Sequence, residues 1–273
     1  MVKHYSEVES NFIFKFCYYF IYPVLKFYFN AKLTNTQNLP KHKKSVIFIS
    51  RHSSHNFEIL LGMFLFYDFY KKPMRGIGHY LINFLSPHYE SCGVVVGTRS
   101  NIHKLIDNNE LVYILPGGAE EMLIGSENAY KLNWISKSGN YRTGFTQIAL
   151  NRDIEIVPIA GYNIEEMSFA PFIIIANYLG ITKQFDNFLK IPGLIGLLFY
   201  YIKIIFSVVF GIFLAIPIPV NIEMNIGKPL KIKENESILE FTKRCESELQ
   251  YLYMKTNNRY EKNIYKALSK SNI

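Results

Sequence analysis

Two histidines and one acid stand close together in "ISRHSSHNFEIL", residues 49–60: His52, His55 and Glu58. A carboxylate that accepts a hydrogen bond from one ring nitrogen of a histidine fixes its tautomer. It also stabilises the positive charge that forms when the other nitrogen takes a proton. Such a pair is a general base that can deprotonate an alcohol. His55 would share a helix face with Glu58 if the helix begins early, so the spacing alone leaves both histidines open as the base.

The same three residues have two other interpretations. One is a polar end on a buried strand, without chemistry. The other is a metal site with H-x2-H-x2-E spacing, but three such side chains on one helix would spread over roughly 120°. Zinc sites need three or four ligands with supporting contacts, and no other His, Cys or Asp cluster stands out, so we expect no bound metal. A serine nucleophile is disfavoured because no G-x-S-x-G motif occurs.

A second group with chemical potential is "ILPGGAEEM", residues 114–122. Gly117 and Gly118 directly follow an apolar run, and glycines in such a place let a bound group approach the backbone closely. Their amide N–H groups could then face an oxyanion or a carbonyl. The alternative is a plain turn, which the Pro-Gly pair alone would justify.

The elements around these motifs alternate in type. Four short apolar runs predict buried strands: 45–50, 93–97, 111–115 and 154–160. Helices are predicted at 57–72, 76–92, 100–110 and 142–150, and "SILE" at 237–240 fits a capping box that opens an amphipathic helix. Residues 220–232 alternate like an exposed strand. We therefore predict an α/β fold whose mostly parallel sheet is flanked by helices. Ligands gather at the carboxyl edge of such a sheet, where His52 stands.

In this order the motifs resemble the glycerolipid acyltransferase superfamily. The resemblance is carried by the His-plus-acid block, "GVVVGTR" (93–99), "LPGGAEE" (115–121), "YRTGF" (141–145) and "IVPIA" (156–160), and it spans roughly residues 45–230. The sequence is most similar to the diacylglycerol-acyltransferase-like branch, which includes phytyl ester synthases and transmembrane relatives. In that branch five residues separate the histidine from its acid, as they separate His52 from Glu58. In the phosphate-handling branch the gap is four and the acid is Asp.

The resemblance implies transfer of a fatty acyl group from acyl-CoA to a hydroxyl, with no further cofactor. It places His52, not His55, at the catalytic position, with Glu58 as its partner. Gly117 and Gly118 would bind the reacting group, and Glu121 and Arg142 would lie at the substrate. Arg99 would face the phosphates of the acyl donor or the acceptor; the alternative for Arg99 is a surface arginine at a helix start.

Charge leads to an expectation about the acceptor. Glu120 and Glu121 stand where phosphate-handling relatives carry an acid followed by an arginine. Two like charges about 4 Å apart repel by about 4 kcal/mol at an effective dielectric near 20, unless Arg99 or Arg142 neutralises them. We therefore expect a neutral acceptor, namely a mono- or diacylglycerol or a long-chain alcohol. The alternatives are a lysophosphatidic acid acyltransferase, a lipid ester or thioester hydrolase and a catalytically silent lipid-binding protein.

Composition adds a membrane to the expected partners. Of the 273 residues 49% are hydrophobic and 16% aromatic, and the net charge is +8. A basic excess favours anionic lipid headgroups or nucleic acid, but no nucleic-acid motif is present, so we expect no nucleic acid. The segment 11–29 is apolar but interrupted by Lys15, Pro23 and Lys26, which predicts an interfacial helix or, alternatively, a core helix. The tract 191–220 contains Lys203, so it either crosses once with Lys203 satisfied by protein or forms a hairpin in one leaflet.

These observations divide the chain into three parts: a membrane-associated segment (1–36), an acyltransferase domain (37–258) that includes the tract 191–220, and a polar tail (259–273). The three cysteines are far apart and odd in number, so they predict no disulfide framework. No secretory signal is visible. We therefore expect a membrane-associated protein whose catalytic domain faces the cytosol.

Overall fold

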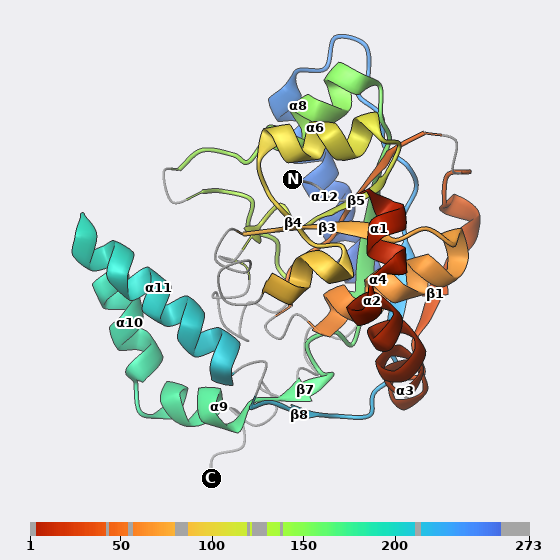
Figure 1. Ribbon diagram of the computed structural model, residues 1–273. Helices are drawn as coiled ribbons and strands as arrows, with labels where there is room; N and C mark the ends of the chain where they lie inside the picture. The colour runs from red at the N-terminus through yellow and green to blue at the C-terminus, as the bar shows by residue number, and fades with distance from the viewer. Residues whose placement is uncertain are drawn as a thin grey trace.

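The fold is built on a seven-stranded sheet with the strand order β1-β9-β6-β2-β5-β3-β4 (Figure 1). The computed structural model describes residues 4–41, 44–53, 57–79, 87–118, 121, 130–136, 139–210 and 214–257. The strands of this sheet are β1 (Lys32–Thr34), β2 (Val46–Ile49), β3 (Met74–Gly78), β4 (Val95–Val96), β5 (Leu111–Ile114), β6 (Ile156–Tyr162) and β9 (Glu223–Ile226). A separate antiparallel pair joins β7 (Ser168–Phe169) to β8 (Ile216–Pro217).

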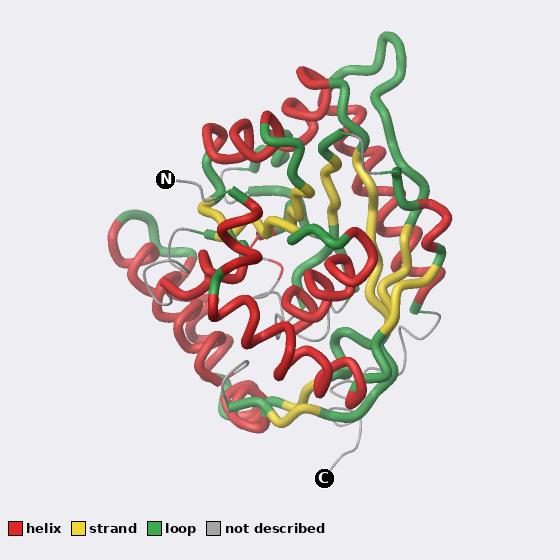
Figure 2. The backbone as a smooth tube through the Cα atoms, turned by 45° about the vertical axis from the view of Figure 1, so that its right-hand side comes forward, coloured by secondary structure: helices red, strands yellow, loops and turns green. Residues whose placement is uncertain are grey.

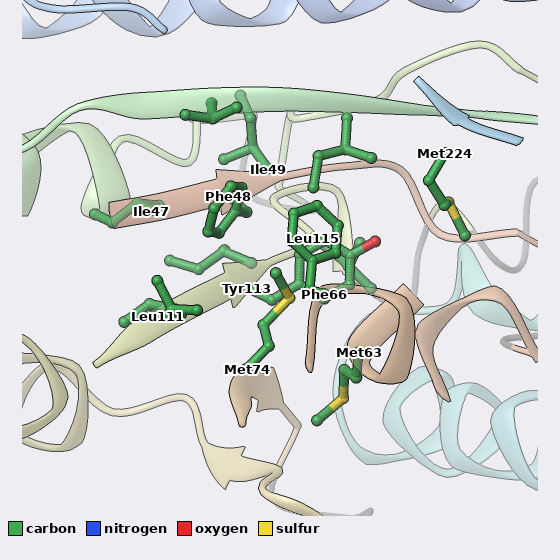
Figure 3. Packing of buried hydrophobic residues seen from close by; sticks show 14 of the residues in the cluster. Ile47, Phe48, Ile49, Met63, Phe66, Met74, Leu111, Tyr113, Leu115 and Met224 are labelled. Carbon is green, nitrogen blue, oxygen red and sulfur yellow. The ribbon is translucent and has the colours of Figure 1, made fainter. Parts of the chain in front are cut away.

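The central strand is β2, which pairs in parallel with β5 on one side and with β6 on the other. All its residues are buried apolar side chains, as expected for a parallel strand covered on both faces. In Figure 3 its side chains pack with Leu111 and Tyr113 of β5 and with Phe66 of the helix that follows β2. Every strand pair of the large sheet is parallel except β6 with β9. The predicted α/β fold with a mostly parallel sheet is confirmed.

Helices cover this sheet on both sides, as Figure 2 shows. In Figure 1 α4 lies in front of the strands and α12 lies behind them. The helices near the sheet are α4 (Phe57–Tyr70), α6 (Arg99–Asp107), α8 (Gly144–Arg152) and α12 (Ile238–Thr256). The capping box that opens α12 is confirmed, since Ser237 and Glu240 bind each other's backbone N–H groups. Its buried residues are Phe241, Thr242, Cys245, Leu249 and Tyr253, so the expected apolar stripe faces the core.

One prediction about the secondary structure is wrong. The helix predicted at 76–92 is instead β3 followed, after residues outside the described part, by a 3-10 helix at Pro87–Cys92 (η3). A short apolar run does not distinguish strand from helix, and here β5 and β4 pair with β3 from either side. The alternating strand predicted at 220–232 is confirmed as β9, whose residues alternate in burial. Strand β1, which the sequence pattern did not indicate, covers its outer side.

The N-terminal segment is a chain of short helices that packs on α4: α1 (Tyr5–Ser10), α2 (Phe12–Phe16), a π-helix (Cys17–Ile21, η1) and α3 (Tyr22–Tyr28). Pro23 stands where the π-helix passes directly into α3, and it lacks the N–H that another residue would donate to the preceding turn. Asp68 of α4 accepts hydrogen bonds from Tyr18 (2.7 Å), Tyr22 (2.6 Å) and Lys26 (2.6 Å). These donors are spaced by four residues, so one face of the segment is fixed to α4.

A second apolar region extends from the sheet as an arm in Figure 1. It consists of α9 (Pro171–Tyr178), α10 (Ile181–Leu189) and α11 (Leu194–Val208). The Lys203 ammonium lies 2.5 Å from the Asp186 carboxylate, so the lysine in the middle of the apolar tract is paired with an acid of the same arm. None of the described helices has the length and apolar character needed to cross a membrane.

We predict that Asp68→Ala releases the N-terminal helices, because three donors lose their shared acceptor at a cost of about 1–3 kcal/mol. Amide hydrogen exchange in residues 12–28 should become faster. Asp107→Asn is the matched control, since the Asp107–Arg152 ion pair is half exposed at the surface and should contribute little. Unchanged exchange in Asp68→Ala would contradict this view of the segment.

Candidate functional site

The two motif groups meet at the carboxyl edge of the sheet. Strands β2 and β5 are parallel neighbours with Ile49 opposite Ile114, so the residues that follow each strand emerge side by side. The N–H of Ser50 donates to the carbonyl of Ile114 at 3.2 Å, which extends the pairing one residue past β2. The histidine block and the glycine block therefore lie next to each other.

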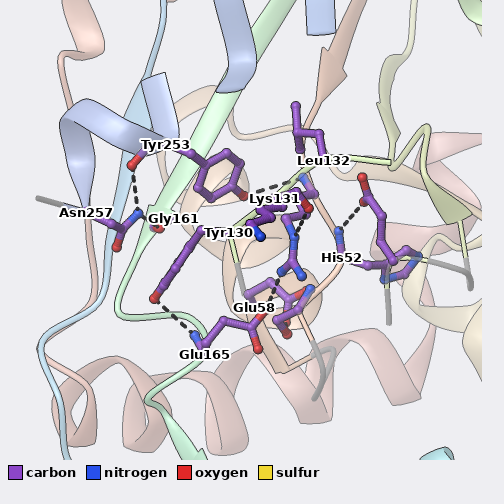
Figure 4. A network of polar contacts seen from close by, with 12 residues as sticks. His52, Glu58, Tyr130, Lys131, Leu132, Gly161, Glu165, Tyr253 and Asn257 are labelled. Atoms are coloured by element: carbon purple, nitrogen blue, oxygen red, sulfur yellow. Dashed lines mark hydrogen bonds and ion pairs between the residues drawn. The ribbon is translucent and has the colours of Figure 1, made fainter. Parts of the chain in front are cut away.

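His52 is half-buried, and its main chain is held firmly. Its N–H donates to Oε2 of Glu121 at 3.1 Å (Figure 4). His55 and Glu120 lie outside the described residues, and so does the metal interpretation that requires His55. Of the two histidines in the motif, His52 is the one that the structure describes, and it follows the carboxyl end of the central strand β2.

Glu58 enters the same turn from the start of α4. Its Oε1 accepts the N–H of Ser53 at 2.9 Å, and its Oε2 accepts the Ser53 hydroxyl. The structure therefore ties Glu58 to the residue directly after His52. Burial raises the pKa of the Glu58 carboxyl to about 7 although the bonds from Ser53 act in the opposite direction; the charge of Glu165 raises it further. Glu58 is thus an acid poised to change its charge near neutral pH.

Glu121 is also buried, and it joins three segments. Its Oε1 accepts the N–H of Asn133 at 3.0 Å while Oε2 binds the N–H of His52. Burial raises the pKa of Glu121 to about 7, while Arg51, the two backbone donors and Arg142 lower it. Glu121 therefore positions the backbone of His52.

The glycine turn is shaped by the same acid. A Cβ on Gly117 would lie 1.9 Å from Cδ of Glu121, so only glycine fits beside this buried side chain. Gly118 has a φ of 59°, and its N–H donates to the carbonyl of Leu115 at 2.9 Å. That N–H closes a turn, which is the alternative that the Pro-Gly pair suggested.

The two predicted arginines have different positions. Arg142 is half-buried, and its Nη1 donates to the carbonyls of Pro116 (3.1 Å) and Gly117 (2.5 Å). It thus stabilises the glycine turn. Arg99 is the exposed first residue of α6, a position that fits a surface arginine at a helix start.

The sequence did not indicate the buried ion pair next to the site, which joins Arg51 to Glu165. Arg51 is fully buried and forms an ion pair with the buried Glu165 in the segment after β6. Tyr253 of α12 lies nearby, with its hydroxyl 3.0 Å from Ser50 Oγ. A charged residue at the end of an all-apolar strand is a signal in the sequence, because a buried charge requires a partner. The partner itself is 114 positions away.

The arrangement is a half-buried histidine next to buried acids, a combination of groups that suits proton transfer. Comparison with known proteins identifies the family, because the sequence pattern of the diacylglycerol acyltransferase family matches residues 6–266. The chain belongs to the diacylglycerol acyltransferase family. Family membership confirms the resemblance on which the site residues were chosen.

Two individual proteins are similar to this chain. A chicken (Gallus gallus) protein described as a "DGAT1/2-independent enzyme synthesizing storage lipids" is 27% identical over 179 residues, which are 66% of this chain and 45% of that protein. This chain therefore spans less than half the length of that relative. The crystal structure of a 1-acyl-sn-glycerophosphate acyltransferase from Thermotoga maritima aligns with a TM-score of 0.49 and 12% identity, covering 84% of this chain and 73% of that one.

We predict that the protein becomes less stable as the pH rises from about 4.5 to 7. Folded Glu58 and Glu121 hold their protons up to a pKa of about 7, whereas the unfolded chain releases them near 4.5. Each acid should therefore lower the free energy of unfolding by about 3 kcal/mol across this range.

Thermal melts at pH 5 and pH 7.5 measure this effect. Glu58→Gln and Glu121→Gln should each reduce the difference between the two melting temperatures. Glu234→Gln, which changes an exposed acid, should leave it as in the wild type. A full difference in Glu58→Gln would show that this carboxyl is already ionised at low pH.

Proposed function

We propose that this acyltransferase moves a fatty acyl group from acyl-CoA to the hydroxyl of a neutral lipid, with His52 as the general base. The neutral lipid is a mono- or diacylglycerol or a long-chain alcohol. The observation that carries the proposal is the place of His52 at the carboxyl end of the central strand. His52 is half-buried, and its N–H is held by Glu121. Glu58 binds the N–H of the next residue, Ser53.

The proposed reaction needs one proton acceptor and no covalent enzyme intermediate. An imidazole nitrogen of His52 takes the hydroxyl proton while the oxygen attacks the thioester carbonyl. The resulting tetrahedral oxyanion collapses and expels the CoA thiolate, which then receives the proton from the imidazolium. A negative environment around His52 supports this step, because it stabilises the imidazolium.

Buried acids support a neutral acceptor. Glu58, Glu121 and Glu165 all lie near the end of β2, and Arg51 is buried among them. An acceptor with a phosphate group would bring further negative charge to this edge. The chicken relative, described as an enzyme that synthesises storage lipids, is in keeping with such an acceptor.

We also propose that the protein binds a membrane and places its catalytic domain on the cytosolic side. Exposed apolar side chains follow one face of the N-terminal helices: Phe12, Phe16, Tyr19, Phe20, Val24 and Phe27. The arm exposes Leu194, Ile195, Leu197 and Leu198. The Tyr28 hydroxyl donates to the carbonyl of Pro217 at 2.9 Å, which links the N-terminal helices to the β8 strand after the arm. Such apolar faces suit insertion between lipid headgroups.

The reaction is tested by product analysis with labelled acyl-CoA and either diacylglycerol or lysophosphatidic acid. We expect transfer to diacylglycerol, and we expect His52→Ala to lower kcat by about 10²–10⁴-fold. His55→Ala is the matched control and should retain most of the activity. Preference for lysophosphatidic acid would overturn the neutral acceptor, release of free fatty acid without acceptor would indicate a hydrolase, and full activity of His52→Ala would remove His52 as the base.

Membrane binding is tested by sedimentation with vesicles of phosphatidylcholine and phosphatidylserine. The double variant Phe16→Glu/Phe20→Glu should weaken binding by about tenfold or more, because two aromatic side chains would no longer insert. Met254→Glu changes an exposed apolar residue on α12 and should bind like the wild type. Equal binding of all three proteins would refute a contact through the N-terminal helices.

A further inference from the structure

Arg51, the residue directly before His52, has an environment that stability alone does not explain. It is fully buried, its Nε donates to the carbonyl of Lys131 at 2.9 Å, and its Nη1 pairs with Glu165. Its Nη2 is buried and has no hydrogen-bond partner among the described residues. Burying an ion pair brings a desolvation cost of several kcal/mol per ion, and apolar residues often replace such pairs without loss. The pair therefore has another use.

The contacts of Arg51 close a ring around His52. Arg51 binds the carbonyl of Lys131, and two residues later the N–H of Asn133 binds Glu121. Glu121 in turn binds the N–H of His52, which is the neighbour of Arg51. Figure 4 shows Lys131 and Glu165 around this turn, with His52 at its edge. Loss of the Arg51 contacts would therefore release residue 51 itself and also the segment 131–133, which holds Glu121 against the N–H of His52.

Arg51 is also a cation shared by two acids. Burial disfavours its charge, but Glu165 and Glu121 outweigh this effect and raise the pKa of Arg51. Tyr253 also faces the guanidinium, and Arg142 faces Glu121 from the other side. The negative charge of Glu165 also acts on Glu58 and raises the pKa of that carboxyl.

Two tyrosine–acid contacts complete the surroundings. The Tyr130 hydroxyl donates to Glu166, and it also accepts the N–H of Glu165 at 3.4 Å. Burial and these two acids raise the pKa of Tyr130 well above its usual value, so it stays neutral. The titrating groups that Arg51 and Glu165 influence are thus Glu121 and Glu58.

We infer that Arg51 is a positioning residue for His52, and that Arg51 and Glu165 together set the charge state of the acids beneath it. This inference rests on the proposed function of His52. Glu165 and Glu121 both interact with the charge of Arg51. Removing Glu165 and removing Arg51 should therefore have opposite effects on Glu121, whereas simple damage to the fold would have the same effect in both.

The test is the pH dependence of kcat/KM for acyl transfer. Glu165→Gln removes the acid that pairs with Arg51, so the positive charge of Arg51 acts more strongly on Glu121. It also removes a negative charge near Glu58. The acidic limb of the pH profile should therefore move to lower pH by about one unit. Arg51→Met removes the cation, so the limb should move to higher pH. Arg51→Lys keeps the positive charge beside Glu165 but loses the hydrogen bond from Nε to the carbonyl of Lys131. It should keep the wild-type limb with a reduced kcat.

Arg51→Met leaves an unpaired acid and could prevent folding, so the double variant Arg51→Met/Glu165→Met accompanies it. That variant is neutral and of similar volume, and its limb should also move to higher pH. The matched control is Glu110→Gln, which breaks the equally buried Arg75–Glu110 pair (2.5 Å) at the other end of β5. It should lower the melting temperature without moving the limb.

Shifts in the same direction for Glu165→Gln and Arg51→Met, or a shift of the limb in Glu110→Gln, would overturn the inference. Failure of the proposed function gives a different result, since the wild type would then lack transfer that depends on His52. In that case ¹³C NMR titration of labelled glutamate carboxyls still tests the charge coupling. The Glu121 signal, assigned by its loss in Glu121→Gln, should titrate at lower pH in Glu165→Gln than in the wild type; an unmoved titration would refute the coupling.

Discussion

Every polar group at the end of β2 has to find its partner inside the protein, because this strand is buried on both faces. The successive residues meet this need with different segments. Ser50 donates its hydroxyl to the carbonyl of Ile159 in β6 at 2.8 Å, Arg51 binds Lys131 and Glu165, and the N–H of His52 binds Glu121. The N–H and hydroxyl of Ser53 then bind Glu58. The half-exposed ring of His52 is thus carried on a backbone that has little freedom to move.

The same constraint explains why the acids here differ from ordinary surface carboxylates. Each is held in the interior by backbone or hydroxyl donors, and burial keeps the pKa of Glu58 and of Glu121 at about 7. Interior donors favour the charged form, while the loss of water favours the neutral one. Small changes in nearby charge can therefore decide their protonation. Glu121 thus holds the backbone of His52 and also has a protonation state that depends on nearby charge.

Much of the fold was predictable from the sequence, because strands β2, β5 and β6 are apolar runs bounded by polar residues and α12 has a capping box. Strands β1 and β3 were not, since Lys32–Thr34 has no periodic pattern and Met74–Gly78 contains an arginine and two glycines. At the site, motif order placed His52 and Glu58 at one edge. The role of Glu121 as a backbone acceptor and the Arg51–Glu165 pair depend on contacts between distant segments, which spacing along the chain does not reveal.

The distance along the chain between Ser50 and its neighbour in α12 has a consequence for biosynthesis. The hydroxyl of Tyr253 reaches Ser50, and Asn257 donates to the carbonyl of Gly161 at 2.9 Å in the adjacent strand. A growing polypeptide on the ribosome that ends before α12 would have β2, β5 and β6 but would lack this cover over their carboxyl ends. Its polar turn would stay open to water and its core face unprotected. The histidine edge therefore gains this cover only after α12 has been synthesised.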